Sequence, residues 1–248
     1  NKNRVIVNIL THAALDIRLG GFNITEYSEP LTIAEIGNNH QGVVENAFKL
    51  IDEAIKSGAS MIKFQHRDLD TLYLKPDEYD KFDLGSQYVF NLVNKYQLSK
   101  ANIFKCFDYC KKSNIAFTCT PFDSKSLNDL EEYGLDFYKV SSSDFLNKHF
   151  LREIISTNKP FIISTGMASD HEIYLQLSWL SSQSDKFIPL HCNSTYPTPF
   201  TDVNLQFMKK LQAWGTGIVG YSGHEQGISV PLAAVVMGAK IIEKHFSL

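Results

Sequence analysis

One unit recurs along this chain: a short apolar run ends in polar or glycine residues, and a longer stretch with helical spacing follows it. Eight such runs occur, at residues 32–37, 60–65, 115–121, 136–142, 160–165, 186–192, 215–220 and 239–245. Strands that alternate with helical segments favour βαβ units and a parallel sheet. Eight of them predict an α/β fold of the closed (β/α)8 TIM-barrel type. No G-x-G-x-x-G motif follows the first run, which disfavours a dinucleotide-binding fold.

The length and composition agree with such a barrel. The chain has 248 residues, of which 44% are hydrophobic, and a single α/β barrel commonly needs about 250. The net charge of −3 disfavours a nucleic-acid-binding surface. The most apolar stretch, residues 230–238, is too short to cross a bilayer. The four cysteines form no C-x-x-C pair, so we expect reduced thiols in a cytoplasmic protein. From the net charge and the short apolar stretch, we expect a protein that binds neither nucleic acid nor membrane.

Residues 1–31 precede the first barrel strand as an N-terminal extension. Within it, residues 5–10 and 16–19 are predicted to form a small hairpin joined near Gly20-Gly21. We expect this hairpin to plug the bottom of the barrel.

Residues 66–114 are too long for one loop and one helix, so a loop over the barrel mouth is expected at 66–85, followed by one or two helices. The chain stops just after the eighth strand, where a complete barrel needs one more helix. We therefore expect a barrel domain at residues 32–248 that is truncated after strand eight, without its last helix.

The active site of such a barrel lies at the C-terminal ends of its strands. Side chains alternate between the two faces of a strand, and four strands carry an ionisable residue on one face near this end. These residues are Glu35, Lys63, Lys139 and Glu243. A buried isolated charge is costly, so such groups must pair or bind a ligand. We predict that the two carboxylates and two ammonium groups meet in one barrel mouth.

Hydroxyl groups gather after strands three to seven, and two histidines end neighbouring strands. The hydroxyl residues are Thr118, Thr120, Ser141, Ser142, Ser143, Ser164, Thr165, Ser194, Thr195 and Ser222. Hydroxyls and lysines are the groups that a phosphate dianion requires. His224 and His245 can converge, and two protein ligands leave positions open for substrate oxygen. This pattern favours a catalytic metal over a closed structural zinc site.

Eight segments, in order, resemble the N-acetylneuraminate (sialic acid) synthase family. They are IAEIGNNHQG (33–42), MIKFQ (61–65), FTCTPFD (117–123), YKVSSSD (138–144), ISTGM (163–167), HCNSTYPTP (191–199), GYSGHEQG (220–227) and GAKIIEKHF (238–246). They cover most of the chain from residue 32 onward, and neither 1–31 nor 66–114 carries a comparable match.

The resemblance implies an enzyme that condenses phosphoenolpyruvate with N-acetylmannosamine, its 6-phosphate or a related N-acylated amino sugar, and water. The products are a nine-carbon sialic-type acid and phosphate. A divalent metal, Mn2+ or Mg2+, would be held by His224 and His245. Full-length members are homodimers, in which a C-terminal antifreeze-like domain reaches the partner's site, and this chain ends before that domain.

The resemblance also implies residue roles. The candidate catalytic residues are Glu35, Lys63, Lys139 and Glu243, and Glu35 would act as base toward the attacking water. The candidate substrate-binding residues are Thr120, Ser142, Asp144, Ser164, Ser194, Tyr196 and Ser222. Asp144 is expected to contact the sugar.

Three other functions stay open. A class I aldolase would use Lys63 or Lys139 to form a Schiff base with pyruvate, although the phosphate-binding and metal-binding groups would then have no purpose. A related phosphoenolpyruvate-dependent synthase would make a 3-deoxy sugar acid by the same chemistry. A non-catalytic barrel domain is disfavoured by the intact set of Glu35, Lys63, His224 and His245.

Overall fold

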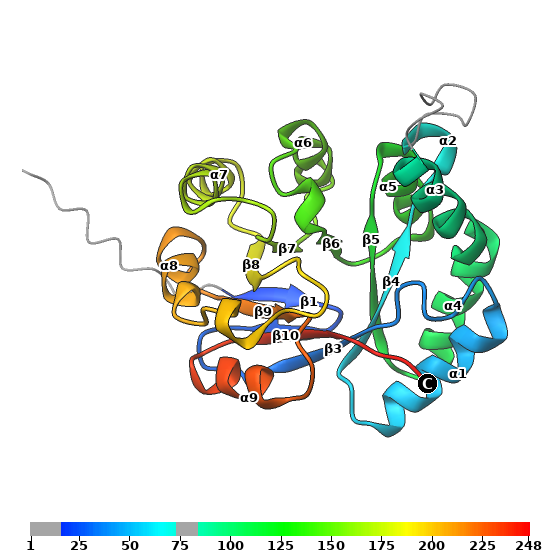
Figure 1. The fold of residues 1–248 in the computed structure, drawn as a ribbon, viewed down its shortest axis with the longest axis horizontal. Helices are drawn as coiled ribbons and strands as arrows, with labels where there is room; N and C mark the ends of the chain where they lie inside the picture. The colour runs from blue at the N-terminus through cyan, green and yellow to red at the C-terminus, as the bar shows by residue number, and fades with distance from the viewer. Residues whose placement is uncertain (1–15, 73–83) are drawn as a thin grey trace, which may run out of the picture.

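The computed structural model describes residues 16–72 and 84–248, which form a closed barrel of parallel strands surrounded by helices (Figure 1). The strand order is β10-β3-β4-β5-β6-β7-β8-β9, and the pairing of β10 with β3 closes the ring. The strands are β3 (Leu31–Glu35), β4 (Met61–His66), β5 (Ala116–Pro121), β6 (Tyr138–Val140), β7 (Phe161–Ser164), β8 (Phe187–Cys192), β9 (Gly220–Gly223) and β10 (Ile241–His245). The predicted fold class is confirmed.

The prediction for the seventh strand, at residues 215–220, is wrong. The strand β9 begins at Gly220, where the prediction ends, because Gly217 has a φ of 84° that interrupts extended backbone. The parallel ladders pair Gly220 with Leu190 and Ser222 with Glu243. Glycine and serine have little intrinsic preference for strands, so pairing with the neighbouring strands defines this segment.

Helices follow the strands from β3 to β9 on the outside of the barrel (Figure 1). They are α1 (Val44–Lys56), α2 (Leu69–Leu72), α3 (Leu84–Tyr96), α4 (Lys100–Lys112), α5 (Ser124–Tyr133), α6 (Lys148–Ser156), α7 (Asp170–Gln183), α8 (Phe207–Trp214) and α9 (Ser229–Val236), with 3-10 turns η2 (Ser142–Asp144) and η3 (Phe200–Asp202). For the one or two helices expected at the end of 66–114, the structure has two, α3 and α4. The loop expected at 66–85 contains the short α2, and its residues 73–83 lie outside the described residues.

Local sequence signals set the ends of several helices. Ser169 caps α7 by accepting from the backbone N–H of Glu172, whose side chain accepts from the N–H of Ser169 in return. Asp123 caps α5, which ends at Gly134 in the left-handed conformation with a φ of 83°. Both caps lie within a few residues of a strand end, so these helices begin close to the mouth of the barrel.

A hairpin closes the opposite, N-terminal end of the barrel. It consists of β1 (Ile17–Leu19) and β2 (Phe22–Ile24), joined by Gly20 and Gly21, both with positive φ. The hairpin and its glycine turn were predicted, but the partner strand is β2 and was missed. The predicted strand at 5–10 lies outside the described residues.

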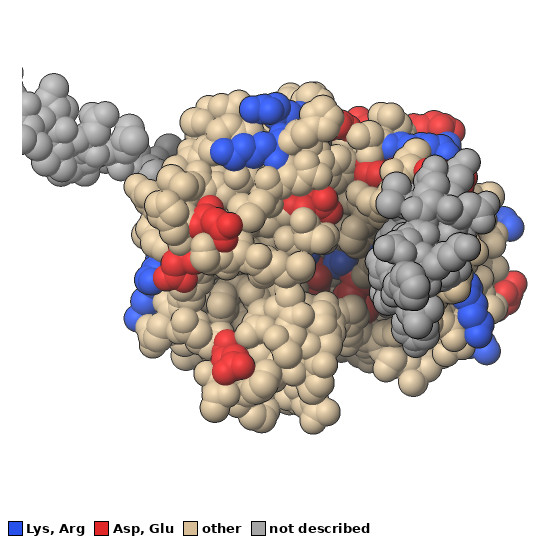
Figure 2. Space-filling view, turned by 45° about the horizontal axis from the view of Figure 1, so that its top comes forward, with Lys and Arg blue, Asp and Glu red and all other residues tan. Residues whose placement is uncertain are grey.

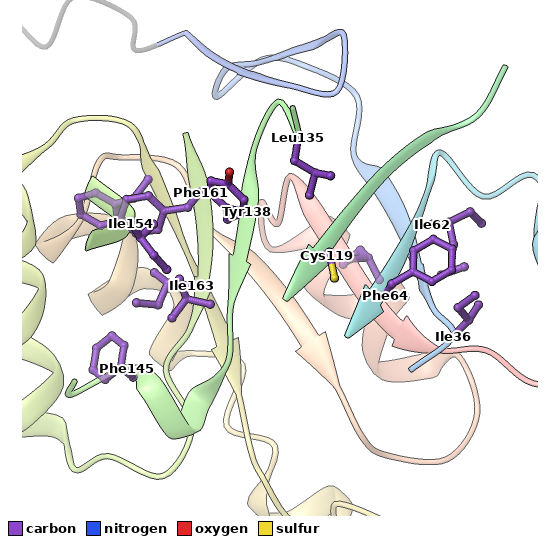
Figure 3. Close-up of a cluster of buried hydrophobic side chains, with 14 of the residues drawn as sticks. Ile36, Ile62, Phe64, Cys119, Leu135, Tyr138, Phe145, Ile154, Phe161 and Ile163 are labelled. Carbon is purple, nitrogen blue, oxygen red and sulfur yellow. The ribbon is translucent and has the colours of Figure 1, made fainter. Parts of the chain in front are cut away.

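The core has two parts, one inside the barrel and one between the strands and the helices. Inside, Ile33, Met61, Phe137 and Ile241 pack with the apolar side chains of the hairpin. Outside, side chains of the alternate strand positions pack beneath the helices, as Ile62, Phe64, Tyr138, Phe161 and Ile163 illustrate (Figure 3). On each strand that contributes to the inner apolar layer, the residue two positions nearer the C-terminal end lies on the same face, and its side chain therefore points into the barrel mouth.

The four cysteines are buried and free, in agreement with the expected reduced thiols. Among the helices of the described residues, none combines the length and the apolar character needed to cross a membrane.

The inner apolar layer should dominate the stability of the barrel. Phe137→Ala removes a fully buried ring and should lower the free energy of unfolding by about 3–5 kcal/mol. Leu175→Ala, at a position that is 50% exposed on α7, is the control and should change it by less than about 0.5 kcal/mol. Urea unfolding measures both, and equal losses would contradict the assignment of this layer as the core.

Candidate active site

The C-terminal ends of the strands surround a cavity of about 310 Å³. Every strand of the barrel contributes at least one side chain to its lining. From β3 to β10 in chain order these are Glu35, Lys63, Thr120, Lys139, Ser164, Cys192, Ser222 and Glu243. Figure 2 shows the hollow near the centre of this face, with basic and acidic atoms at its floor and mostly uncharged residues around it. The cavity lies where barrel enzymes place their active sites.

The floor of the cavity is a network of buried charges. Lys63 forms a close ion pair with Glu35, its register partner on the neighbouring strand. Its Nζ also lies 3.5 Å from Glu243 Oε1, while Lys139 Nζ lies 3.7 Å from Glu243 Oε2. All four side chains are at most 8% exposed. The structure thus brings together the four ionisable residues that the sequence pattern selected.

These charges shift one another's pKa values. Burial alone would lower the pKa of Lys63, but Glu243 and Glu35 outweigh burial and raise it. Burial lowers the pKa of Lys139, and Glu243 only partly offsets this. Burial would raise the pKa of the Glu243 carboxyl, yet Lys139 and Lys63 hold it below its usual range. Lys139 therefore gives up its proton at a lower pH than Lys63.

Hydroxyl groups form the wall above the lysines. Lys63 Nζ donates to Thr120 Oγ1 at 3.2 Å, and the N–H of Gly166 donates to Ser142 Oγ at 3.1 Å. A Cβ on Gly166 would clash with Ser194 Oγ and would lie 2.7 Å from Ser142 Oγ, so the missing side chain leaves room for both hydroxyls. In the described part of the chain, the buried Ser164 Oγ has no hydrogen-bond partner.

The two histidines meet on the opposite side of the mouth. The ring centroids of His224 and His245 are 5.6 Å apart. His224 Nδ1 lies 2.7 Å from the carbonyl oxygen of Asn193, which can only accept, so Nδ1 carries the proton and Nε2 keeps its lone pair in the neutral ring. Tyr196 stacks on His224 with centroids 3.9 Å apart, and its hydroxyl lies 2.7 Å from Nε2.

The donor set fits a metal with open coordination positions. Burial lowers the pKa of His245, which favours a neutral imidazole with a free lone pair. For His224, burial alone would lower the pKa, but hydrogen bonding to Cys192 raises it. Across residues 16–72 and 84–248, no three or more His, Cys, Asp or Glu side chains gather into a metal cluster. Two histidine ligands alone would leave coordination positions of a metal open to substrate or water.

The sugar contact expected for Asp144 stays a prediction. This residue lies outside the described residues that line the cavity. Its Oδ2 accepts from Ser141 Oγ at 3.0 Å and from Ser143 Oγ at 3.3 Å, and its Oδ1 accepts from Asn147 at 3.3 Å. Burial raises the pKa of this carboxyl. Because Ser141 and Ser143 do line the cavity, Asp144 orients hydroxyls rather than facing the cavity itself.

The NeuB family model matches residues 50–248 of this chain. This chain belongs to the NeuB family. The resemblance inferred from its motifs is thereby confirmed.

Two curated relatives and one solved structure illustrate the match. The chain is 40% identical to N,N'-diacetyllegionaminic acid synthase of Campylobacter jejuni, over 88% of this chain and 67% of that protein. It is 35% identical to N-acetylneuraminate-9-phosphate synthase of Drosophila melanogaster, over 87% of this chain and 59% of that protein. The sialic acid synthetase of Leptospira borgpetersenii superimposes with a TM-score of 0.84 at 34% identity, covering 96% of this chain and 80% of that one.

Some residues that line the cavity of this NeuB-family barrel were not selected from the sequence as functional. They include Gln65, Phe122, Met167 and Cys192. Alternation did place Gln65 on the face of Lys63, but a neutral amide gives no signal of chemistry. Phe122 and Met167 lie in loops beyond their strands, where alternation ends. Met167 has a φ of 63°, which the sequence does not reveal.

The buried network of this NeuB-family site should depend on each of its carboxylates. Glu243→Gln leaves Lys139 beside Lys63 without the carboxylate that both lysines contact, and should lower the free energy of unfolding by about 3–5 kcal/mol. The matched control is Glu132→Gln, whose carboxylate is 67% exposed in an ion pair with Lys100 and whose loss should cost at most about 1 kcal/mol. Urea unfolding at neutral pH compares them. A cost near that of the control would show that the lysines need no counterion there.

Proposed function

We propose that this barrel condenses phosphoenolpyruvate with an N-acylated amino sugar of the N-acetylmannosamine type, and with water, to give a nine-carbon sialic-type acid and phosphate. The observation that carries the proposal is the cavity in which two buried lysines and a set of hydroxyls face a histidine pair. The names of the relatives, which are synthases of legionaminic acid and of N-acetylneuraminate 9-phosphate, support this class of reaction.

The lysines and hydroxyls are proposed to bind phosphoenolpyruvate. Lys63 and Lys139 supply positive charge, and Thr120, Ser142 and Ser194 supply hydroxyls. The isolated Ser164 Oγ supports this assignment, because a buried hydroxyl without a partner is costly and is therefore expected to meet a ligand.

The carboxylates support the same proposal. Glu35 Oε2 forms the close ion pair with Lys63, whereas in the described part of the chain the buried Glu243 Oε2 accepts no hydrogen bond, although Lys139 Nζ lies 3.7 Å away. An arriving phosphate would compete with them for Lys63 and Lys139. The displaced Glu35 carboxylate would then be available to accept a proton.

The proposed reaction forms a carbon–carbon bond and a bond from C2 to the oxygen of water, and it breaks the bond from C2 to the phosphate oxygen. The C3 carbon of phosphoenolpyruvate attacks the sugar aldehyde carbon, whose oxygen takes up a proton, and positive charge develops at C2. Water adds at C2 while Glu35 accepts one of its protons, which balances the proton taken up by the aldehyde oxygen. The tetrahedral intermediate then expels phosphate, which takes the proton of the C2 hydroxyl, and a keto group remains. The lysines and hydroxyls contribute by holding the two reactants in place, and positioning of this kind lowers a barrier by up to about 7–11 kcal/mol.

His224 and His245 are proposed to hold a divalent metal, Mn2+ or Mg2+. The neutral ring favoured for His245 and the 5.6 Å separation of the ring centroids support this assignment. When bound, the metal would supply polarisation of the aldehyde carbonyl. Tyr196, stacked on His224, would fix the orientation of that ring.

The sugar is proposed to reach from the histidines to the opposite wall. In the ring of strands, β6 lies four places from β10 and therefore across the barrel. The loop after β6 presents the hydroxyls of Ser141 and Ser143, held by Asp144. These hydroxyls are suited to the polar groups at the far end of an amino sugar. In this assignment Asp144 acts through the two serines, and its direct contact with the sugar stays a separate prediction.

The remaining organisation is proposed from the family. The matched region spans between 59% and 67% of the two curated relatives described above. We infer that residues 32–248 form the barrel of a longer cytoplasmic enzyme, which continues into a C-terminal antifreeze-like domain and acts as a homodimer.

Phosphate release by the full-length protein tests the proposed function. With phosphoenolpyruvate and Mn2+, release should require a sugar, supplied in turn as N-acetylmannosamine, its 6-phosphate and a 2,4-diacetamido sugar. Because the histidine pair is proposed to hold a required metal, EDTA should abolish the release and added Mn2+ should restore it. If no sugar gave phosphate release and borohydride trapped pyruvate on the protein, these results would instead favour a Schiff-base aldolase.

The proposed role of Glu35 predicts a specific kinetic defect. Glu35→Gln should lower kcat by about 100-fold or more, because a positioned base contributes about 10²–10⁴-fold, while phosphoenolpyruvate binding changes little. Glu45→Gln, at an exposed position in the first turn of α1, is the matched control and should leave kcat unchanged. Steady-state kinetics and calorimetric binding measure the two effects. An unchanged kcat in Glu35→Gln would contradict the proposed role of Glu35 as base.

A further inference from the structure

Three polar side chains form a chain of hydrogen bonds that leads from the rim of the barrel to the buried carboxylate of Glu35. Gln65 Nε2 donates to Glu35 Oε1 at 3.3 Å. Arg67 Nη2 in turn donates to Gln65 Oε1. Gln65 lines the cavity, whereas Arg67 lies outside the described residues that do so. Arg67 therefore reaches the site through Gln65.

The chemistry of the two outer groups fixes the amide between them. A guanidinium has only donors, and an ionised carboxylate has only acceptors. The amide satisfies both neighbours only with its oxygen toward Arg67 and its NH2 group toward Glu35. Without Arg67, the carboxylate alone would orient the amide, and the oxygen end of the Gln65 side chain would lose its anchor. The guanidinium thus holds the amide in the orientation in which its donor faces Glu35.

Both ends of this chain are held by their surroundings. The Arg67 guanidinium lies over the ring of Phe122, 4.1 Å from its centroid, in a stacking arrangement that arginine favours. At the other end, a Cβ on Gly37 would lie 2.6 Å from Glu35 Oε1 and 3.2 Å from Gln65 Nε2. The φ of Gly37 is 35°, which also disfavours a side chain. Glycine leaves the room in which the amide and the carboxylate meet.

We propose that Arg67 is a positioning residue for Glu35 and acts through Gln65; the inference rests on the proposed role of Glu35 as base. Glu35 has a second hold, the ion pair between its Oε2 and Lys63. When phosphoenolpyruvate engages Lys63, that hold weakens. The hydrogen bond from Gln65 to Oε1 then keeps Oε2 directed at the water.

The test uses the full-length protein and two substitutions of Arg67. Arg67→Met keeps an unbranched stem of similar girth but removes the donor, and should lower kcat between about 10-fold and 100-fold, the range expected when a catalytic group is misplaced. The KM values for phosphoenolpyruvate and for the sugar should stay within about twofold, since Arg67 is not among the described residues that line the cavity where both are proposed to bind. Arg67→Lys retains a donor without the planar fork and should restore part of kcat.

The matched control is Lys125→Met, a neighbouring cation near the same rim. Lys125 is 58% exposed and pairs with Asp68. Its loss should leave kcat within about twofold of the wild type. Equal losses of kcat in Lys125→Met and Arg67→Met would indicate a general effect of charge at the rim and would overturn the inference. A rise in the KM for the sugar with unchanged kcat would make Arg67 a sugar contact and would overturn it as well.

A double-mutant cycle decides whether the effect passes through Glu35. In a Glu35→Gln background, Arg67→Met should cause no further loss of kcat, because the base that it positions is already gone. Losses that multiply would overturn the inference while leaving the proposed function intact. A wild-type protein that releases no phosphate with any sugar would overturn the proposed function, and the inference with it.

Discussion

The mutual neutralisation of two lysines and two glutamates inside the barrel is the interaction on which this structure depends. The four side chains come from β3, β4, β6 and β10, so they connect the two halves of the ring. Each would be costly to bury alone. A shift of one residue in any of these strands would turn its charge outward. The charges therefore constrain the register of the strands, and they also form the floor of the cavity.

The apolar layer beneath the charges strengthens the ion pairs among the four side chains. Ile33, Met61, Phe137 and Ile241 fill the barrel together with the N-terminal hairpin, which excludes water from below. Charge–charge interactions are screened far less in such apolar surroundings than in bulk water. The cavity is therefore open to substrates from one side only, and its buried hydroxyls and ion pairs face that opening.

Alternation along strands made much of this arrangement predictable from the sequence. It placed Glu35, Lys63, Lys139 and Glu243 on the inner face, where the structure brings them together. It gave no information where the chain leaves the strand: Asp144, which the family resemblance selected, lies in the 3-10 turn η2 and is not among the described residues that line the cavity. The strand β9, with the sequence GYSG, carries no local strand signal. The contact between Arg67 and Phe122 joins two different loops, and no local pattern encodes it.

The pairing of β10 with β3 joins the first and the last strands of the barrel, and it makes His245 the register partner of Glu35. Residues that are far apart in the sequence thus become neighbours only when the ring closes. A ligand that binds to both β10 and β3 bridges these two strands. Its binding free energy then adds to the stability of the closed barrel. The site therefore forms only when the barrel closes, and a barrel in which β10 and β3 are unpaired would have no complete site.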